Sequence, residues 1–164
     1  MKLARYQTEA AVTISTDDAW TMAIHAVLGI ASEMDEFLGA VIDEEGKEHI
    51  QKEIGDCCWM LAELCTANGW KMQDIVSLDE WTVRKGGTIG ELCGIYQKVI
   101  QGHPLDEAHV RVIIRGLWAQ LMQYCKREGF KMQDILDLNI KKLRKRYPNG
   151  FEAERSMHRA DGDV

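Results

Sequence analysis

The 164-residue sequence has only two prolines, Pro104 and Pro148, and no apolar run long enough to cross a membrane. The longest stretch without a charged residue, between Asp18 and Glu33, has fourteen residues, whereas a membrane-spanning helix needs about 20. The first ten residues also lack the apolar segment of a secretory signal peptide. We therefore expect no membrane partner and a cytoplasmic location.

The five cysteines are an odd number and form no Cys-x-x-Cys pair. They lie at apolar positions of helix-like segments, which predicts reduced core residues rather than a disulfide framework. A net charge of −6 argues against general nucleic-acid binding, which needs a basic surface. Because proline is scarce, long segments are free to be helical, and a hydrophobic content of 46% suffices for one buried core in a single domain over 1–164.

Two acidic pairs with i,i+3 spacing occur in the segment 30–61: Glu33 with Glu36, and Glu53 with Asp56. This spacing places both members of a pair on one side of an α-helix. Each acid directly precedes an apolar residue of a helically spaced series, and the acids therefore flank the buried faces of two predicted helices. The two series are Ile30, Met34, Phe37 and Val41, then Ile50, Ile54, Cys57 and Leu61.

The polar stretch 43–46, which ends in a glycine, suits a chain reversal between these helices. In an antiparallel hairpin, Glu33 would face Asp56 and Glu36 would face Glu53, since both cross-pairs are centred on the same point of the turn. Two like charges about 4 Å apart repel by about 4 kcal/mol at an effective dielectric near 20, so four converging carboxylates should take up protons or hold cations. Oxygen ligands favour Mg²⁺ or Mn²⁺. The alternative is an ordinary solvated helix face, because 28% of the residues are charged.

One turn of the sequence occurs twice, sixty positions apart. Residues 68–79, NGWKMQDIVSLD, recur at 128–139 as EGFKMQDILDLN. We interpret this as a duplicated helix–turn–helix unit, with repeat units at about 20–80 and 81–147 and a polar tail at 151–164. The second copy lacks the acids, because their counterparts are Cys93, Tyr96, Ile113 and Gly116. A cation site would therefore belong to the first copy alone.

Apolar spacing and turn signals together predict an all-α fold, a helical bundle of antiparallel hairpins with a degenerate internal duplication. The predicted helices span about residues 2–12, 17–44, 47–67, 88–101, 105–127 and 132–147.

The motif Glu33-x-x-Glu36, a spacer over 37–52, and Glu53-x-x-Asp56 resembles the all-α NTP pyrophosphohydrolases of the MazG type, a superfamily that includes the dimeric dUTPases. Two other stretches are similar to that family: Tyr6-Gln7, and NIKKLRKRYPNGF at 139–151. The resemblance covers about residues 3–68 and 118–155. The residues between these ranges do not fit a single compact domain of the family.

The resemblance implies hydrolysis of a nucleoside triphosphate substrate, NTP or dNTP, to a nucleoside monophosphate and pyrophosphate. It implies Mg²⁺, with Mn²⁺ as an alternative, and it implies a homo-oligomer, dimer or tetramer. The implied metal ligands and catalytic residues are Glu33, Glu36, Glu53 and Asp56, and it stays open which of these orients the attacking water. The implied substrate-binding residues are Asn139, Lys142 and Arg146. In the first repeat unit these three correspond to Asp79, Thr82 and Gly86.

Two classes of function follow from these patterns. The intact acids favour a hydrolase, whereas the degenerate second copy favours a non-catalytic helical module for oligomerisation or partner binding. A di-iron carboxylate bundle is excluded, because it needs two Glu-x-x-His motifs and the only acid-x-x-His sequence is Asp106 with His109. His25 lies in an apolar segment, and we expect it to be a core histidine rather than a contact to a nucleobase. Arg144 and Lys145 are equally well explained as solvated cations near a helix end.

Overall fold

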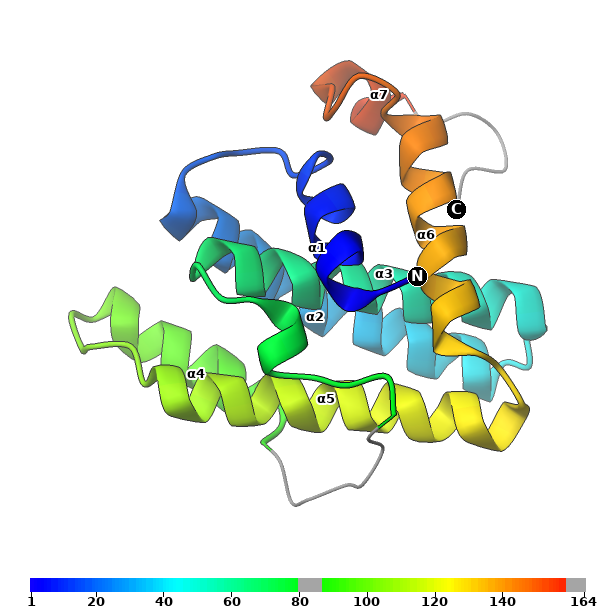
Figure 1. The fold of residues 1–164 in the computed structure, drawn as a ribbon. Coiled ribbons are helices and arrows are strands. Elements are labelled where there is room, and N and C mark those ends of the chain that lie inside the picture. Colours follow the sequence, from blue (N-terminus) through cyan, green and yellow to red (C-terminus); the bar gives the residue numbers. More distant parts are fainter. Residues whose placement is uncertain (80–86, 159–164) are drawn as a thin grey trace.

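The computed structural model describes residues 1–79 and 87–158, and within these residues the chain forms seven α-helices, one 3-10 turn and no β-strand (Figure 1). The all-α class is therefore confirmed. None of the helices in these ranges is both long and apolar enough to cross a membrane. In chain order the elements are α1 (Leu3–Ala11), α2 (Ala19–Ile42), α3 (Lys47–Ala67), η1 (Met72–Asp74), α4 (Ile89–Ile100), α5 (Glu107–Glu128), α6 (Met132–Arg146) and α7 (Ala153–Met157).

The helices α2 and α3 form the predicted antiparallel hairpin and are the most closely packed pair in the chain. Asp18 caps the start of α2 by accepting a hydrogen bond from the backbone N–H of Thr21 at 2.7 Å. The reversal ends at Gly46, whose φ of 93° lies in the left-handed region that glycine adopts at little cost. The two predicted apolar series are buried between the helices, with Val41 only half-buried.

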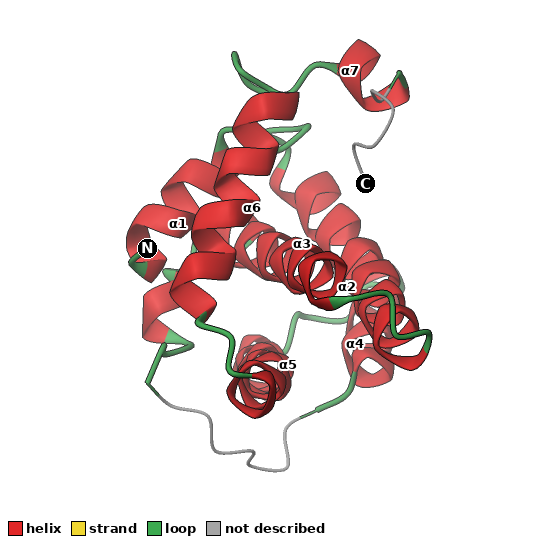
Figure 2. Cartoon of the chain, turned by 90° about the vertical axis from the view of Figure 1, so that its right-hand side faces the viewer, coloured by secondary structure: helices red, strands yellow, loops and turns green. Residues whose placement is uncertain are grey.

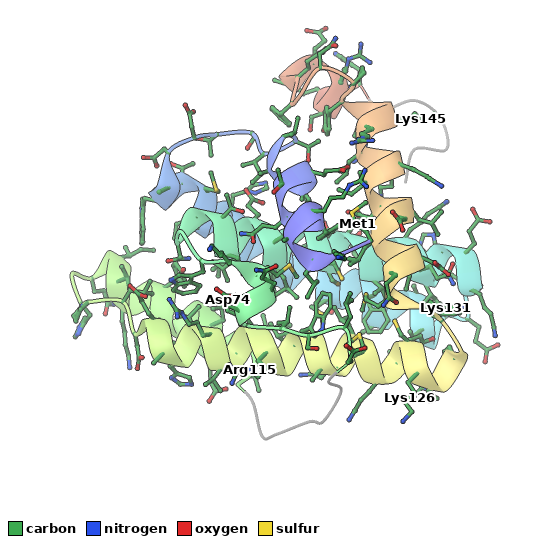
Figure 3. All side chains as sticks on the ribbon, viewed as in Figure 1. Met1, Asp74, Arg115, Lys126, Lys131 and Lys145 are labelled. Carbon is green, nitrogen blue, oxygen red and sulfur yellow. The ribbon has the colours of Figure 1, made fainter. Side chains whose placement is uncertain are left out.

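Further helices cover two sides of this hairpin. On one side α6 packs against both α3 and α1, and Figure 2 shows α1 and α6 standing side by side across α3. The N-terminal amino group of Met1 ties the start of the chain to α6 through an ion pair with Asp137 at 3.0 Å. Figure 3 shows Met1 beside α6. On the other side α4 packs against α2 and α5. The packing of α6 against α3 thus brings the last long helix next to the acidic segment of α3.

The duplicated turn has the same backbone in both copies. Gly69 and Gly129 have φ angles of 68° and 74°, and each follows a long helix. The next residue in each copy, Trp70 or Phe130, donates its backbone N–H to the carbonyl five positions back at 2.8 Å. The nearly identical sequences thus form the same type of turn. Residues 80–86, which include the start of the second repeat unit, lie outside the described residues, as do residues 159–164 of the tail.

The two copies diverge directly after this turn. In the first copy the chain leaves the helical path, and α5 side chains bind its carbonyl groups: Arg115 donates to Ile75 O at 3.1 Å and Trp118 donates to Ser77 O at 2.8 Å. Figure 3 shows Arg115 beside the turn that contains Asp74. In the second copy the chain continues as α6 for fifteen residues. Because α6 is one continuous helix, it reaches back to the acidic hairpin.

All five cysteines are free thiols, four of them buried and Cys93 half-buried, as expected for core residues. Phe151 packs against Tyr147 with ring centroids 5.2 Å apart, and the short helix α7 follows, which the sequence did not predict.

Candidate active site

Three of the four predicted acids share one site. Glu33 from α2 and Glu53 and Asp56 from α3 each direct a carboxylate oxygen to within 4.8 Å of the others. Glu53 is buried, with only 4% of its surface exposed, and the other two are half-buried. The fourth acid, Glu36, lines the same cavity but lies at its exposed rim, where its carboxylate accepts a hydrogen bond from Ser32 at 3.0 Å. The expected convergence at one point thus holds for three acids and not for Glu36.

The shared site raises the pKa values of its carboxyl groups. Burial, followed by the negative charges of Asp56, Glu36 and Glu53, raises the pKa of Glu33 from 4.5 to about 7. Burial and the charge of Asp56 also raise the pKa of Glu53. Burial raises the pKa of Asp56 as well, although the positive charge of Lys142 opposes this rise. Burial is the largest cause of all three rises, so the site favours either a proton or a bound cation that offsets the cost of burying these carboxylates.

The helix α6 brings two of the predicted substrate-binding residues to the same site. Asn139 Nδ2 donates to Asp56 Oδ1 at 2.9 Å, and Lys142 Nζ lies 2.5 Å from Asp56 Oδ2. The side chains of Lys142 and Asp56 are 15% and 16% exposed, so this ion pair is partly shielded from water. Arg146 lines the cavity one turn further along, and its positive charge, like that of Lys142, opposes the rise in the pKa of Asp56. The last long helix thus docks onto the acidic hairpin.

Two residues to which the sequence assigned no role fix the orientation of Asn139. The fully buried Tyr6 hydroxyl donates to Asn139 Oδ1 at 2.8 Å, which leaves the amide Nδ2 facing Asp56. Gly55 lets α6 come close, because a Cβ at this position would lie 3.0 Å from the Asn139 Cβ. The only available signal for Tyr6 was the family-like Tyr6-Gln7 pair.

The acids and the cations face a cavity of about 380 Å³. Its walls come from α2, α3 and α6, and the loop before α2 and the segment after α6 close one part of it. Several of the lining residues were not predicted as site residues from the sequence; they are Ser15, Trp59, Met60, Tyr147, Phe151 and Ser156. The cavity thus continues well beyond the carboxylates.

His25 also lines this cavity, which corrects the prediction of a core histidine. Its side chain is 43% exposed, whereas Glu63 on α3, which lies 3.0 Å from His25 Nδ1, is fully buried. The hydrogen bond to Glu63 raises the pKa of the imidazole. Trp59 lies edge-on to the same ring, with centroids 6.2 Å apart. The apolar neighbours of His25 in the sequence hid this pairing, because its partner is on the other helix.

A second histidine contacts the acids from the opposite end of the hairpin. His49 Nε2 lies 3.2 Å from Glu53 Oε1 and 2.7 Å from Glu45 Oε2, and all three residues are spaced by four along the chain. His49 therefore holds Glu53 in place from the side of the turn between α2 and α3.

No protein-family model matches the chain, and neither the search of curated proteins nor that of solved structures finds a match. The residues in the cavity are therefore the basis for a functional assignment.

Proposed function

We propose that this chain is a Mg²⁺-dependent nucleoside triphosphate pyrophosphohydrolase, similar to the MazG-type family, which releases pyrophosphate and a nucleoside monophosphate. The observation that carries the proposal is the position of Lys142 and Arg146 opposite three carboxylates in one cavity. Carboxylates alone would suit many cation sites. Carboxylates faced by cationic side chains suit a ligand that carries phosphates together with a divalent ion.

The donor set fits Mg²⁺ or Mn²⁺. Its three oxygens, all from carboxylates, lie within 4.8 Å of one another. Oxygen donors are the ligands that these hard ions prefer, and burial raises the pKa of each carboxyl group, so a bound ion would offset the cost of keeping the three charged. When bound, the ion would supply positive charge that neutralises the triphosphate and the departing pyrophosphate.

The residues on α6 would bind the phosphates. In the structure Lys142 neutralises Asp56, and a cation at the carboxylates would release the lysine ammonium to a phosphate oxygen. Arg146 lies one turn further along the cavity and has a guanidinium group suited to a second phosphate oxygen. Asn139 keeps Asp56 in position through its amide and is itself held by Tyr6.

Glu36 differs from the other acids because it lies at the cavity rim. It either joins as a fourth cation ligand or accepts the proton of the attacking water. The variant Glu36→Gln separates these roles. Weaker Mg²⁺ binding would assign it to the ligands, whereas unchanged binding with a lower kcat would assign it to the water.

The test is pyrophosphate release from a panel of NTPs and dNTPs, with and without Mg²⁺. We expect Mg²⁺-dependent release by the wild-type protein and a loss of at least about 100-fold in Glu53→Gln, because this change removes a charged ligand and preserves side-chain shape. Glu48→Gln is the matched control, since Glu48 is on the same helix with its side chain 89% exposed. Release from no nucleotide, or equal activity of Glu53→Gln and the control, would overturn the proposal.

The second candidate is a non-catalytic helical module that assembles through its surface. Large apolar side chains on the outer face of α2 support assembly: Leu28 is 65%, Leu38 is 50% and Ile42 is 77% exposed. Such a surface suits a homo-oligomer, dimer or tetramer, which light scattering after size-exclusion chromatography would detect. Assembly without any nucleotide hydrolysis would favour this candidate over the enzyme.

A further inference from the structure

The pair formed by His25 and Glu63 has no role in binding cations or phosphates, yet it is part of the cavity wall. Glu63 is completely buried, and both of its carboxylate oxygens lie 3.0 Å from His25 Nδ1. A buried carboxylate is costly unless it has a counter-charge or hydrogen-bond donors. Within residues 1–79 and 87–158 the structure gives Glu63 one ion-pair partner, His25. The pair is therefore a built feature rather than a chance surface contact.

This pairing determines what the imidazole offers to a ligand. Because the Glu63 carboxylate accepts from Nδ1, that nitrogen carries a proton, and the ring orientation is fixed. The negative charge of Glu63 favours the doubly protonated ring, in which Nε2–H is also a donor. With 43% of its side chain exposed, His25 has a free edge with which to contact a molecule in the cavity.

The pair is displaced from the carboxylates along both helices. His25 precedes Glu33 by eight residues on α2, or about 12 Å at 1.5 Å per residue. Glu63 follows Asp56 by seven residues on α3, or about 10 Å. Trp59 lies on α3 between Asp56 and Glu63 and also lines the cavity. A triphosphate held at the acids would therefore extend its sugar and base toward His25 and Trp59.

We infer that His25, positioned by Glu63, and Trp59 form the base-recognition end of the cavity, and that the substrates carry a base with a carbonyl oxygen at its outer edge. In the doubly protonated ring that Glu63 favours, the Nε2–H group of His25 donates to that oxygen, and the indole ring of Trp59 provides an apolar wall for the base. Uracil, thymine and guanine present such a carbonyl. Cytosine and adenine present an amino group there, which would place a donor against a donor. This inference rests on the proposed function for the position of the phosphates.

The test compares dUTP with dCTP, because uracil has a carbonyl at position 4 and a proton on N3, whereas cytosine has an amino group at position 4 and an unprotonated N3. We expect kcat/KM for dUTP to exceed that for dCTP, and His25→Ala to lower the value for dUTP by about tenfold or more while changing that for dCTP much less. Glu63→Gln keeps an acceptor for Nδ1 but removes the negative charge. It should therefore reduce the ratio of kcat/KM for dUTP to kcat/KM for dCTP. The matched control is His109→Ala, a change of an exposed histidine on α5.

Calorimetric binding of α,β-imido-dUTP and α,β-imido-dCTP gives a readout that does not depend on turnover. Tighter binding of the uracil analogue that weakens selectively in His25→Ala supports the inference, even if no nucleotide is hydrolysed and the proposed function fails. Equal binding of both analogues, tighter binding of the cytosine analogue, binding of neither, or an equal loss for both in His25→Ala would overturn it. If Glu63→Gln proves unfolded by its thermal melt, the comparison of wild type with His25→Ala still decides the outcome.

Discussion

Removing one negative charge from the shared acidic site should stabilise the cation-free protein. Glu33 has a pKa of about 7 in the folded chain against an ordinary 4.5, so the folded state holds its proton more tightly than the unfolded state does. The contribution of Glu33 to the free energy of unfolding therefore falls as the pH rises from about 4.5 to 7, and it is constant at higher pH. One pKa unit corresponds to 1.36 kcal/mol, which sets an upper limit of about 3 kcal/mol for this penalty. Because Glu33 is only half-buried, solvent screening reduces it to about 1–2 kcal/mol.

The variant Glu33→Gln has no charge to bury, so the stability that it gains over the wild type should show the same pH dependence. In urea denaturation with EDTA, we expect the variant to be about 1–2 kcal/mol more stable than the wild type at pH 8, and about a quarter of that at pH 5. Asp35→Asn, an exposed change on the same helix, is the control and should show little effect at either pH. The reasoning is refuted if Glu33→Gln is destabilised at both pH values, or if its effect does not change between them.

Two other substitutions test how α6 is held against α3, and a third is their comparison. In Tyr6→Phe, Asn139 Oδ1 loses a buried partner, and we expect a loss of about 1–3 kcal/mol in the free energy of unfolding; a change below about 0.5 kcal/mol would contradict this role. Gly55→Ala would place a Cβ 3.0 Å from Asn139 and should cost about 1–3 kcal/mol. Gly39→Ala is its counterpart, since no atom lies within 4 Å of its added Cβ, and it should stabilise α2 by about 0.5–1 kcal/mol. Equal effects of the two glycine changes in thermal or urea denaturation would show that close approach at Gly55 is unimportant.

Helix positions and the hairpin were predictable because local signals determine them. The apolar series of α2 and α3 are regular, and Gly46, Gly69 and Gly129 each have the positive φ that the turn residues suggested. The repeated turn was equally predictable, since the same residues make the same backbone hydrogen bonds in both copies. The docking of α6 onto the acids could only be inferred, because it depends on a tertiary fit at Gly55.

The exact composition of the site was less accessible from the sequence. An i,i+3 pair is rotated by about 60° around the helix, so the spacing alone does not determine whether both acids enter the site, as Glu53 and Asp56 do, or whether one lies at its rim, as Glu36 does. His25 was expected in the core because its neighbours are apolar, but its environment is set by Glu63 on the facing helix. The same antiparallel register that relates Glu33 to Asp56 also places His25 beside Glu63. That register could have identified the pair, whereas its exposure to the cavity depends on side-chain packing across three helices.

The most direct test of the central claim is anomalous diffraction from crystals of this protein grown with Mn²⁺. We predict an anomalous peak between the carboxylates of Glu33, Glu53 and Asp56, with the Lys142 ammonium moved away from Asp56. The absence of a peak at these carboxylates, or Mn²⁺ bound only elsewhere, would contradict the account.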